Sequence, residues 1–462
     1  MDKNAGSIVR DLPRIDAILE HPDITALSSE MSREHLLRIA RAEVDSEREA
    51  ILAGKRTSCP TVDEFAARVA CVVREKLAPK HYPTINMTGI ILNTSLGRAP
   101  LAPSVARHIY EGISGYCRLA AHPRTGKRYD RDILVGKMIA EIFGAEAATF
   151  VNNNAAATYL VLTALTAGKE VIVSRGQLVE IGGKFRSPAV MAASGAKLVE
   201  VGTTNRTHLK DYKAAITENT GAILRVHTSN FRIKGFASTP TIAELAELAH
   251  EHGLLCIDDV GSGQPMPFAP LSLPDDYDIH SSVAAGADII CFSGDKLLGG
   301  VQSGIILGKK EHIERMRSHP LVRALRCDKM TVLGLDATMR LYYNPEKAMR
   351  EIPVLRHLGI PSSELKKTAM RLSRRIGPEY SKRVVEDRTY VGGGSLPDID
   401  LRTWTIRLQR NDMGAEELAS RLRLGTPAVF PRVEENEVIL DLRTLLPGQE
   451  KGLLSALKNV GK

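Results

Sequence analysis

A lysine follows a short apolar run in the segment Ile289-Ile290-Cys291-Phe292-Ser293-Gly294-Asp295-Lys296-Leu297-Leu298-Gly299-Gly300. The first four residues predict a buried strand, which the Ser-Gly pair ends. Lys296 then lies among small residues where a strand meets a loop, a common place for reactive groups in α/β proteins. A lysine that forms an imine needs a lowered pKa and room beside it for a flat ring. Taken alone, the segment is equally consistent with an ordinary surface lysine.

Short apolar runs alternate with helical patterns through the middle of the chain. The runs that predict strands are Ala148–Val151, Glu170–Val173, Lys197–Val201, Ala222–Val226, Leu254–Ile257 and Asp288–Phe292. The helical patterns include 132–143, a helix that opens at 152–157, and 242–250. This alternation is typical of an α/β protein whose wound, mainly parallel sheet carries helices on both faces.

The length of 462 residues predicts two or three domains. We expect a helical N-terminal domain at 1–80, a large catalytic domain at 81–345 and a small α+β domain at 346–462. The first contains a helix from Ser32 to about Ala53 and another from about Val62 to Leu77.

The two later domains are predicted from strand and helix patterns. An extended run over Ile85–Thr94 opens the large domain. Strands at Trp404–Leu408 and Val438–Leu442 lie on either side of a helix at Ala415–Leu424 and characterise the small one.

The composition is that of an ordinary globular protein, with 43% hydrophobic and 25% charged residues. We find no apolar run long enough to span a membrane and no apolar signal-peptide core, so we expect a cytoplasmic protein. The six cysteines form no C-x-x-C pair, which argues against a zinc ribbon and against a secreted disulfide scaffold.

The formal net charge of +8 permits an anionic partner without proving one. Basic residues concentrate soon after the lysine segment, at Arg315, Arg317, Arg323, Arg326 and Lys329. Most such runs are solvated helix faces. Residues 1–80 carry about as many acids as bases and do not form a basic tail.

Polar groups follow several of the predicted strands. Asn153, Asn154 and Ala155 lie at a strand-to-helix junction, where free backbone N–H groups and the positive end of the helix can seat a phosphate. Ser293 could donate to the same group. Asn230, at the end of another strand, could reach a substituent of a bound ring.

Two adjacent carboxylates, Asp258 and Asp259, end a further strand. Ligands bind outside the carboxyl ends of strands in open α/β sheets, and a carboxylate there could keep a pyridinium nitrogen protonated. A capping aspartate is the alternative interpretation of either residue. Phosphate seat, carboxylate and Lys296 together predict a pyridoxal 5'-phosphate site of the aminotransferase-like class.

Several long blocks resemble one enzyme family, bacterial selenocysteine synthase, the L-seryl-tRNA(Sec) selenium transferases of pyridoxal-phosphate fold type I. The blocks are 94–101 (TSLGRAPL), 151–157 (VNNNAAA), 174–183 (SRGQLVEIGG), 200–208 (EVGTTNRTH), 226–231 (VHTSNF), 293–300 (SGDKLLGG) and 318–326 (SHPLVRALR). The similarity covers about 85–345 and is weaker at 392–397 (GGGSLP) and 440–445. Ser95, Gly393 and the loop 122–132 depart from the family pattern.

The resemblance implies a reaction in which selenium replaces the seryl oxygen on a tRNA. Lys296 would hold the cofactor covalently and later remove the Cα proton. Asp259, which begins the family's Asp-hydrophobic-Gly-Ser-Gly block, would keep the pyridine nitrogen protonated. Hydroxide leaves, and the resulting aminoacrylyl-tRNA accepts selenium from selenophosphate.

The resemblance also implies roles for other residues and partners. Arg98, Arg323 and Arg326 would bind the phosphate-bearing donor, because guanidinium groups are planar, permanently charged forks. Asp295 would assist proton transfer or orient the donor. Glu180, Thr203 and Thr204 are further residues of interest. Domain 1–80 corresponds to the family's tRNA-recognition domain, and members assemble as rings of dimers, a decamer by resemblance.

Two alternatives remain open from the sequence. The chain could be a pyridoxal-phosphate lyase or transferase that acts on a free amino acid with a sulfur or other donor. It could also be a non-catalytic tRNA-binding scaffold that has kept the fold.

Overall fold

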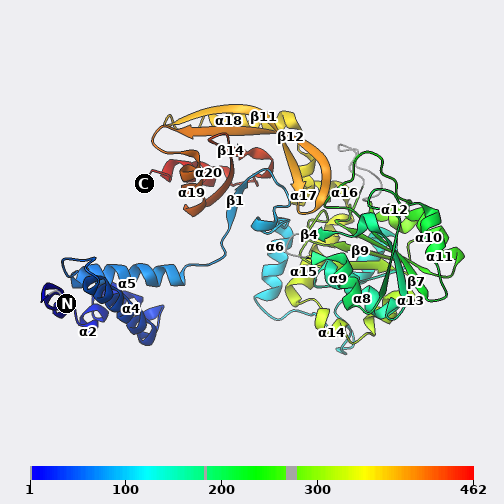
Figure 1. The fold of residues 1–462 in the computed structure, drawn as a ribbon, viewed down its shortest axis with the longest axis horizontal. Helices are drawn as coiled ribbons and strands as arrows, with labels where there is room; N and C mark the ends of the chain where they lie inside the picture. The colour runs from blue at the N-terminus through cyan, green and yellow to red at the C-terminus, as the bar shows by residue number, and fades with distance from the viewer. Residues whose placement is uncertain (1–2, 182–184, 267–277, 462) are drawn as a thin grey trace. The chain divides into compact units, whose positions relative to one another are not determined.

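The computed structural model describes residues 3–181, 185–266 and 278–461. Its internal contacts divide the chain into two compact units, one that ends at Pro83 and one that begins at Thr84 (Figure 1). No helix among these described residues is both long and apolar enough to cross a bilayer.

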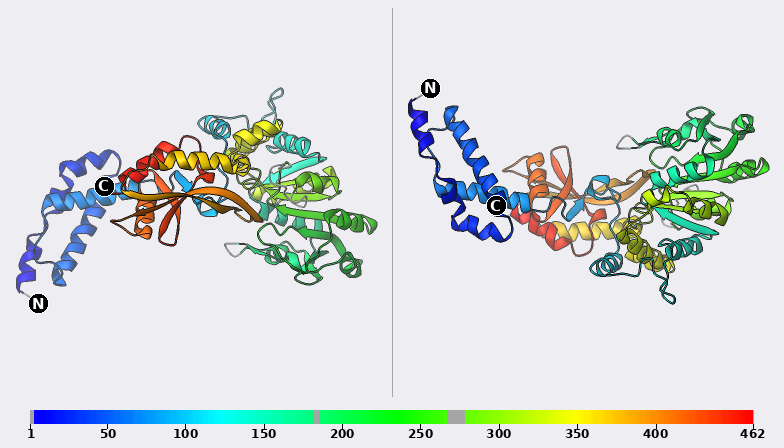
Figure 2. Two further views of the ribbon diagram at one scale, coloured as in Figure 1. Left: turned by 90° about the horizontal axis from the view of Figure 1, so that it is seen from above. Right: turned by 90° about the horizontal axis from the view of Figure 1, so that it is seen from below.

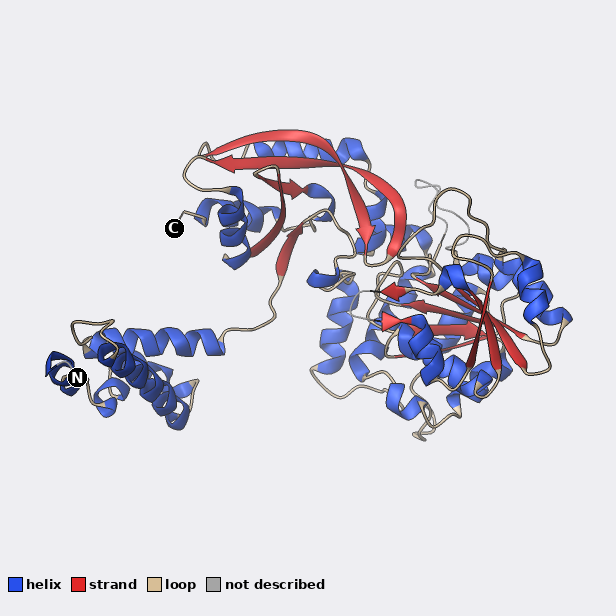
Figure 3. Ribbon diagram, in the orientation of Figure 1, coloured by secondary structure: helices blue, strands red, loops and turns tan. Residues whose placement is uncertain are grey.

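The first unit is built from helices (Figure 3). They are α1 (Lys3–Arg10), α2 (Ile15–Leu19), α3 (Pro22–Thr25), η1 (Ala26–Ser29), α4 (Arg33–Leu52) and α5 (Val62–Leu77). Ser32 caps α4 by accepting from the His35 N–H, and Thr61 with Glu64 forms a capping box on α5. Both predicted helices are therefore confirmed, since polar side chains satisfy the first N–H groups at the expected positions.

The second unit contains a seven-stranded sheet. Its strands lie in the order β2 (Ala147–Val151), β10 (Gly304–Gly308), β9 (Ile289–Ser293), β8 (Leu255–Gly261), β7 (Thr220–Val226), β3 (Glu170–Ser174) and β6 (Lys197–Val201). All neighbours run parallel except β10, which is antiparallel to both β2 and β9. The predicted wound, mainly parallel α/β sheet is confirmed. Strand β10 was not among the predicted strands.

Helices cover both faces of this sheet (Figure 2). On one face, α8 (Asn154–Thr166), α9 (Ser187–Ala193) and α13 (Lys310–Arg317) pack on residues such as Cys291 and Ile306. On the other face, α7 (Ile133–Phe143), α10 (Leu209–Ala215), α11 (Ile242–Glu251), α12 (Ile279–Ala284) and α15 (Lys329–Tyr342) pack on the alternate residues, such as Ile290 and Phe292. Because helices cover both faces of the sheet, side chains on both sides of each central strand are buried. This explains why these strands are continuous apolar runs in the sequence.

A five-stranded sheet of order β1-β13-β14-β12-β11 forms the C-terminal part of the same unit. It comprises β1 (Thr84–Met87), β13 (Ala428–Glu434), β14 (Glu437–Asp441) and the long hairpin of β12 (Ser395–Arg410) and β11 (Tyr380–Gly392). Helices α18 (Ser362–Ser373), α19 (Ala415–Leu424) and α20 (Glu450–Asn459) pack on it. The strands predicted at Trp404–Leu408 and Val438–Leu442 are parts of β12 and β14.

Two segments differ from the sequence expectation. The extended run predicted to reach Thr94 is wrong beyond Met87, because Gly89 turns the chain at φ 80° and Asn93 caps a short helix, η2 (Thr94–Leu96). β1 pairs with β13 and so belongs to the C-terminal sheet. Helices α16 (Pro345–Glu351) and α17 (Pro353–Gly359) were expected in the small domain, but they pack into the core beside the large sheet.

Candidate functional site

Lys296 lies just beyond the end of β9 in a tight turn. The Gly294 N–H donates to the Ser303 carbonyl at 2.9 Å, and the Gly300 N–H donates to the Gly294 carbonyl at 2.8 Å. The lysine is only 9% exposed. Burial lowers the pKa of Lys296, and the Arg98 cation lowers it further. The carboxylates of Asp259 and Asp295 raise this pKa but do not cancel the effect of burial. A buried amine with a lowered pKa is suited to nucleophilic chemistry.

The two adjacent aspartates of β8 have different surroundings. Asp258 is fully buried and accepts from Arg225 Nε at 2.7 Å, from Arg225 Nη2 at 2.6 Å and from Ser282 Oγ of α12 at 2.6 Å. Asp259 is directed to the other face, where Asn154 Nδ2 and Thr158 Oγ1 of α8 donate to it at 2.8 and 2.9 Å. Burial raises the pKa of Asp259, and these two hydrogen bonds and Lys296 lower it.

The N-terminus of α8 adjoins Asp259. The Asn153 side chain caps this helix by accepting from the Ala156 N–H at 2.9 Å, and Ala155 is half-buried in the first turn. Asn154 is connected to the aspartate through its amide nitrogen, while its Oδ1 is buried without a hydrogen-bond partner in the described part of the chain. The junction therefore combines an anion-binding helix end with an unsatisfied acceptor.

Two further predicted residues are Asn230 and Ser293. Ser293 ends the strand that precedes Lys296. Asn230 and Lys296 both lie against Gly394, since a methyl group built on that glycine would lie 3.2 Å from Asn230 Cβ and 3.9 Å from Lys296 Nζ. Asn230 Oδ1 is a second buried acceptor that lacks a partner among the described residues. Ser293 is buried as the last residue of β9.

Arg98 approaches the lysine turn from the loop after η2. It adopts a positive φ of 62°, and its Nη1 donates to Asp295 Oδ2 at 2.6 Å. The Arg98 side chain is 37% exposed, whereas that of Asp295 is 11% exposed. This pair thus places a cation at the solvent side of Lys296.

Arg323 and Arg326 lie elsewhere on the second unit. Both are exposed, on and just after α14 (Val322–Leu325). Partial desolvation and the charges of Arg323, Arg131 and Arg128 lower the pKa of Arg326, which identifies a cluster of four arginines. Within the described ranges, no hydrogen bond or ion pair joins this cluster to Lys296. Its loop does contact the junction between β2 and α8, because the Asn152 N–H donates to the Leu325 carbonyl at 3.0 Å.

Glu180, Thr203 and Thr204 make their described contacts away from Lys296. Glu180 pairs with Arg186 at 2.6 Å across the hairpin of β4 (Glu180–Ile181) and β5 (Phe185–Arg186). Thr203 Oγ1 donates to the Arg206 carbonyl at 3.0 Å. Thr204 lines a separate cavity.

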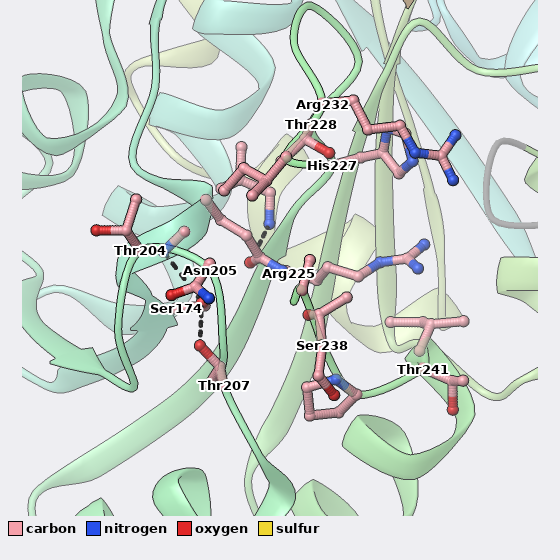
Figure 4. A pocket seen from close by; sticks show the side chains of 18 of the residues that line it. Ser174, Thr204, Asn205, Thr207, Arg225, His227, Thr228, Arg232, Ser238 and Thr241 are labelled. Carbon is pink, nitrogen blue, oxygen red and sulfur yellow. Dashed lines mark hydrogen bonds between the residues drawn. The ribbon is translucent and has the colours of Figure 1, made fainter. Parts of the chain in front are cut away.

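That cavity has a volume of about 630 Å³ and lies beyond the ends of β3 and β7 (Figure 4). Its labelled lining residues are Ser174, Thr204, Asn205, Thr207, Arg225, His227, Thr228, Arg232, Ser238 and Thr241. The Ser174 and Thr207 hydroxyls are hydrogen-bonded at 2.7 Å. Lys296 is not among its described lining residues, so this cavity is distinct from the surroundings of the lysine.

The residues around Lys296 fit pyridoxal 5'-phosphate. The end of α8 can seat a phosphate, Asp259 offers a carboxylate to a ring nitrogen, and the buried amine can bond to an aldehyde. The orphaned Oδ1 atoms of Asn154 and Asn230 would accept from polar substituents of a bound ring.

The turn between β11 and β12, which was predicted only as part of a block that resembles the family, also lies against Lys296. Its signal was the run Gly392-Gly393-Gly394, three consecutive residues with φ between 61° and 79°. A run of glycines in a strand pattern marks a bend or a close backbone approach.

Comparison with known proteins identifies the family. A model described as L-seryl-tRNA selenium transferase matches residues 84–446, and one described as selenocysteine synthase N terminal matches residues 9–48. The chain is 44% identical to the L-seryl-tRNA(Sec) selenium transferase of Desulfotalea psychrophila, over 99% of this chain and 98% of that protein. It is 42% identical to the protein of that name from Carboxydothermus hydrogenoformans, over 95% of each.

A solved structure of D-glucosaminate-6-phosphate ammonia-lyase has a TM-score of 0.58 and 19% identity, covering 84% of this chain and 97% of that chain. This likeness supports the fold alone, the aminotransferase-like architecture of fold type I. The matched models and relatives cover both units, and the chain belongs to the L-seryl-tRNA selenium transferase family of enzymes.

Proposed function

We propose that the chain is a cytoplasmic enzyme that converts seryl-tRNA(Sec) to selenocysteinyl-tRNA(Sec) with selenophosphate as the selenium donor. Family membership supports the overall conversion. The main structural support for this chemistry is that Lys296 is buried near Asp259 at the carboxyl edge of the sheet, where burial lowers the pKa of its amine.

In this proposal, Lys296 is the residue that bonds pyridoxal phosphate and then moves a proton. Burial lowers its pKa and so favours the neutral amine, the form that can attack an aldehyde and later take the Cα proton of the seryl group. The cofactor, when bound, supplies an electron sink that allows the serine hydroxyl to leave.

Asp259, Asn153, Asn154, Ala155, Ser293 and Asn230 are the proposed cofactor-binding residues. Asp259 would hold a proton at the ring nitrogen, because Asn154 and Thr158 fix its carboxylate at the site while Asp258 is engaged by Arg225. The backbone at Ala155 and the Ser293 hydroxyl would bind the phosphate.

Arg98 and Asp295 are proposed to act on the donor side of Lys296. Arg98 lies at the solvent side of the lysine and could bind an anionic donor, with Asp295 orienting its guanidinium. Arg323 and Arg326 are exposed and could recruit the phosphate of the donor or of the tRNA.

The first unit is proposed to recognise the tRNA, and the chain is proposed to form a homo-oligomer. The match of residues 9–48 to the selenocysteine synthase N terminal model supports an added, separately folded module. Large exposed side chains on the second unit, such as Tyr110 and Tyr116, are available for contacts between subunits.

The decisive experiment is to incubate the protein with charged seryl-tRNA(Sec), pyridoxal phosphate and selenophosphate and to identify the esterified amino acid. We expect selenocysteine with the native chain and unchanged serine with Lys296→Ala. Turnover of free serine without use of seryl-tRNA would instead favour a lyase or transferase of free amino acids.

A further inference from the structure

The turn that joins β11 to β12 has an unusual backbone. Gly392, Gly393 and Gly394 have φ values of 79°, 61° and 69°, and Leu396 has a φ of 51°. Leu396 is 1% exposed. Non-glycine residues in this region are strained and persist only where their surroundings fix them. The surroundings of this turn must therefore hold it in place.

A buried serine beyond the end of β8 supplies that restraint. Ser262 Oγ donates to the Gly394 carbonyl at 2.9 Å and lies 2.7 Å from Ser395 Oγ. Ser262 is 0% exposed and Ser395 is 2% exposed. Since Ser262 follows Asp259 by three residues, the C-terminal hairpin is bonded to the same strand end that carries the candidate carboxylate.

The glycines are required because other segments lie against them. A Cβ on Gly392 would lie 2.3 Å from Ile90 Cγ2, and one on Gly393 would lie 2.8 Å from Leu92 Cβ. A Cβ on Gly394 would lie 3.2 Å from Asn230 Cβ and 3.9 Å from Lys296 Nζ. The turn therefore lies against Lys296 with its backbone, and at Gly394 it has no side chain toward Nζ.

We propose that Gly394 and Ser262 are positioning residues for Lys296. Ser262 holds the turn at a fixed distance from the amine, and the missing side chain at residue 394 leaves the room that Nζ needs when an aldehyde approaches it. This inference rests on the proposed role of Lys296, and it assigns to the C-terminal hairpin a part in building the site.

The first test compares Gly394→Ala with Gly448→Ala. Both glycines have a positive φ, 69° and 86°, but a Cβ on Gly448 meets nothing within 4 Å. Both variants carry the backbone strain of alanine, and only the first places a methyl group tightly against Asn230 Cβ and in van der Waals contact with Lys296 Nζ. We expect covalent attachment of pyridoxal phosphate to Lys296 to be about tenfold slower in Gly394→Ala alone. The visible absorbance of the attached cofactor measures this rate. Equal rates in the two variants would overturn the proposal.

The second test uses Ser262→Ala, with Ser194→Ala as the matched control, because Ser194 is also buried and donates to a backbone carbonyl, that of Met191. We expect faster amide hydrogen exchange at 391–396 and slower attachment of pyridoxal phosphate in Ser262→Ala only. Faster exchange with unchanged attachment would show a purely structural serine and would overturn the proposal.

Both readouts are independent of selenium transfer. If the chain attaches pyridoxal phosphate but does not use seryl-tRNA, the proposed substrate is wrong while these comparisons retain their meaning. If seryl-tRNA is converted and the attachment rates do not differ from the controls, only the positioning role fails.

Discussion

At the scale of single residues, the neighbouring aspartates of β8 show how a strand separates two functions. Successive side chains of a strand point to opposite faces, so Asp258 meets Arg225 and Ser282 while Asp259 meets α8. Sequence patterning places both carboxylates at the strand end. It does not identify which face carries α8, because that depends on the order in which distant segments pack.

Substitution of each aspartate should therefore have a different effect. Asp258→Asn removes one partner of a buried ion pair, and we expect a loss of about 3–5 kcal/mol in the free energy of unfolding. Asp259→Asn should leave stability closer to that of the native chain and lower the activity by about two orders of magnitude or more. Denaturant unfolding and steady-state rates measure the two effects. The reverse pattern would reassign the ring contact to Asp258.

The pKa of Lys296 predicts how cofactor attachment depends on pH. Because burial lowers this pKa, the neutral amine is present at lower pH than for a free lysine, and the attachment rate should rise with pH to a plateau whose midpoint is correspondingly low. Arg98→Ala removes a cation that lowers the pKa and should raise the midpoint. Asp295→Asn removes an anion that raises the pKa and should lower it. Shifts in the same direction would contradict these assignments.

The site could be predicted only in part. Lys296, Asp259 and the α8 junction follow strand ends, and strand ends are visible as apolar runs followed by polar residues. Arg98 was predicted only through the resemblance, because its approach to Asp295 depends on a loop residue with a positive φ. The position of the Gly394 turn depends on its hydrogen bond with Ser262, which lies 132 positions away along the chain. Contacts of that separation leave no local pattern in the sequence.

At the scale of elements, prediction succeeded where the periodicity was strong. Helix α5 begins and ends as expected, because Thr61 and Glu64 form its capping box and Pro79 follows it. The long hairpin was recognised only at 404–408 of β12, since many residues of β11 are partly exposed and its apolar alternation is weak. Strand β10 has only three apolar residues, between Gly304 and Gly308, and glycines usually indicate turns.

Helices α4 and α5 are joined by an ion pair whose carboxylate is buried. Glu47 of α4 is 4% exposed and contacts Arg68 of α5 at 2.6 Å and Arg56 at 3.3 Å. Glu47→Gln leaves two cations without their shared anion, and we expect a loss of about 1–3 kcal/mol of stability in this unit. Hydrogen exchange of α4 and α5 in the full chain measures it, and the exposed Glu49→Gln is the control. Equal protection in both variants would refute a stabilising pair.

At the scale of the whole molecule, the boundary between the units separates the proposed tasks. Pro83 ends the first unit, and β1 begins at Thr84 as part of the C-terminal sheet. Every residue that we place around Lys296 lies after this boundary. A chain that begins at Thr84 should therefore fold, because it keeps β1, and should attach pyridoxal phosphate at the native rate.

The same truncated chain should bind seryl-tRNA(Sec) much more weakly than the full chain, if the helical unit recognises the RNA. RNA affinity is measured at one fixed salt concentration, because contacts to phosphates are strongly salt-dependent. Glu49→Gln in the full chain controls for small changes in charge. Retained affinity after truncation would move recognition to the second unit, where the exposed Arg128, Arg323 and Arg326 and the partly buried Arg131 are the groups that could provide it. Charge reversal of Arg323 and Arg326 in the truncated chain would then have to abolish binding.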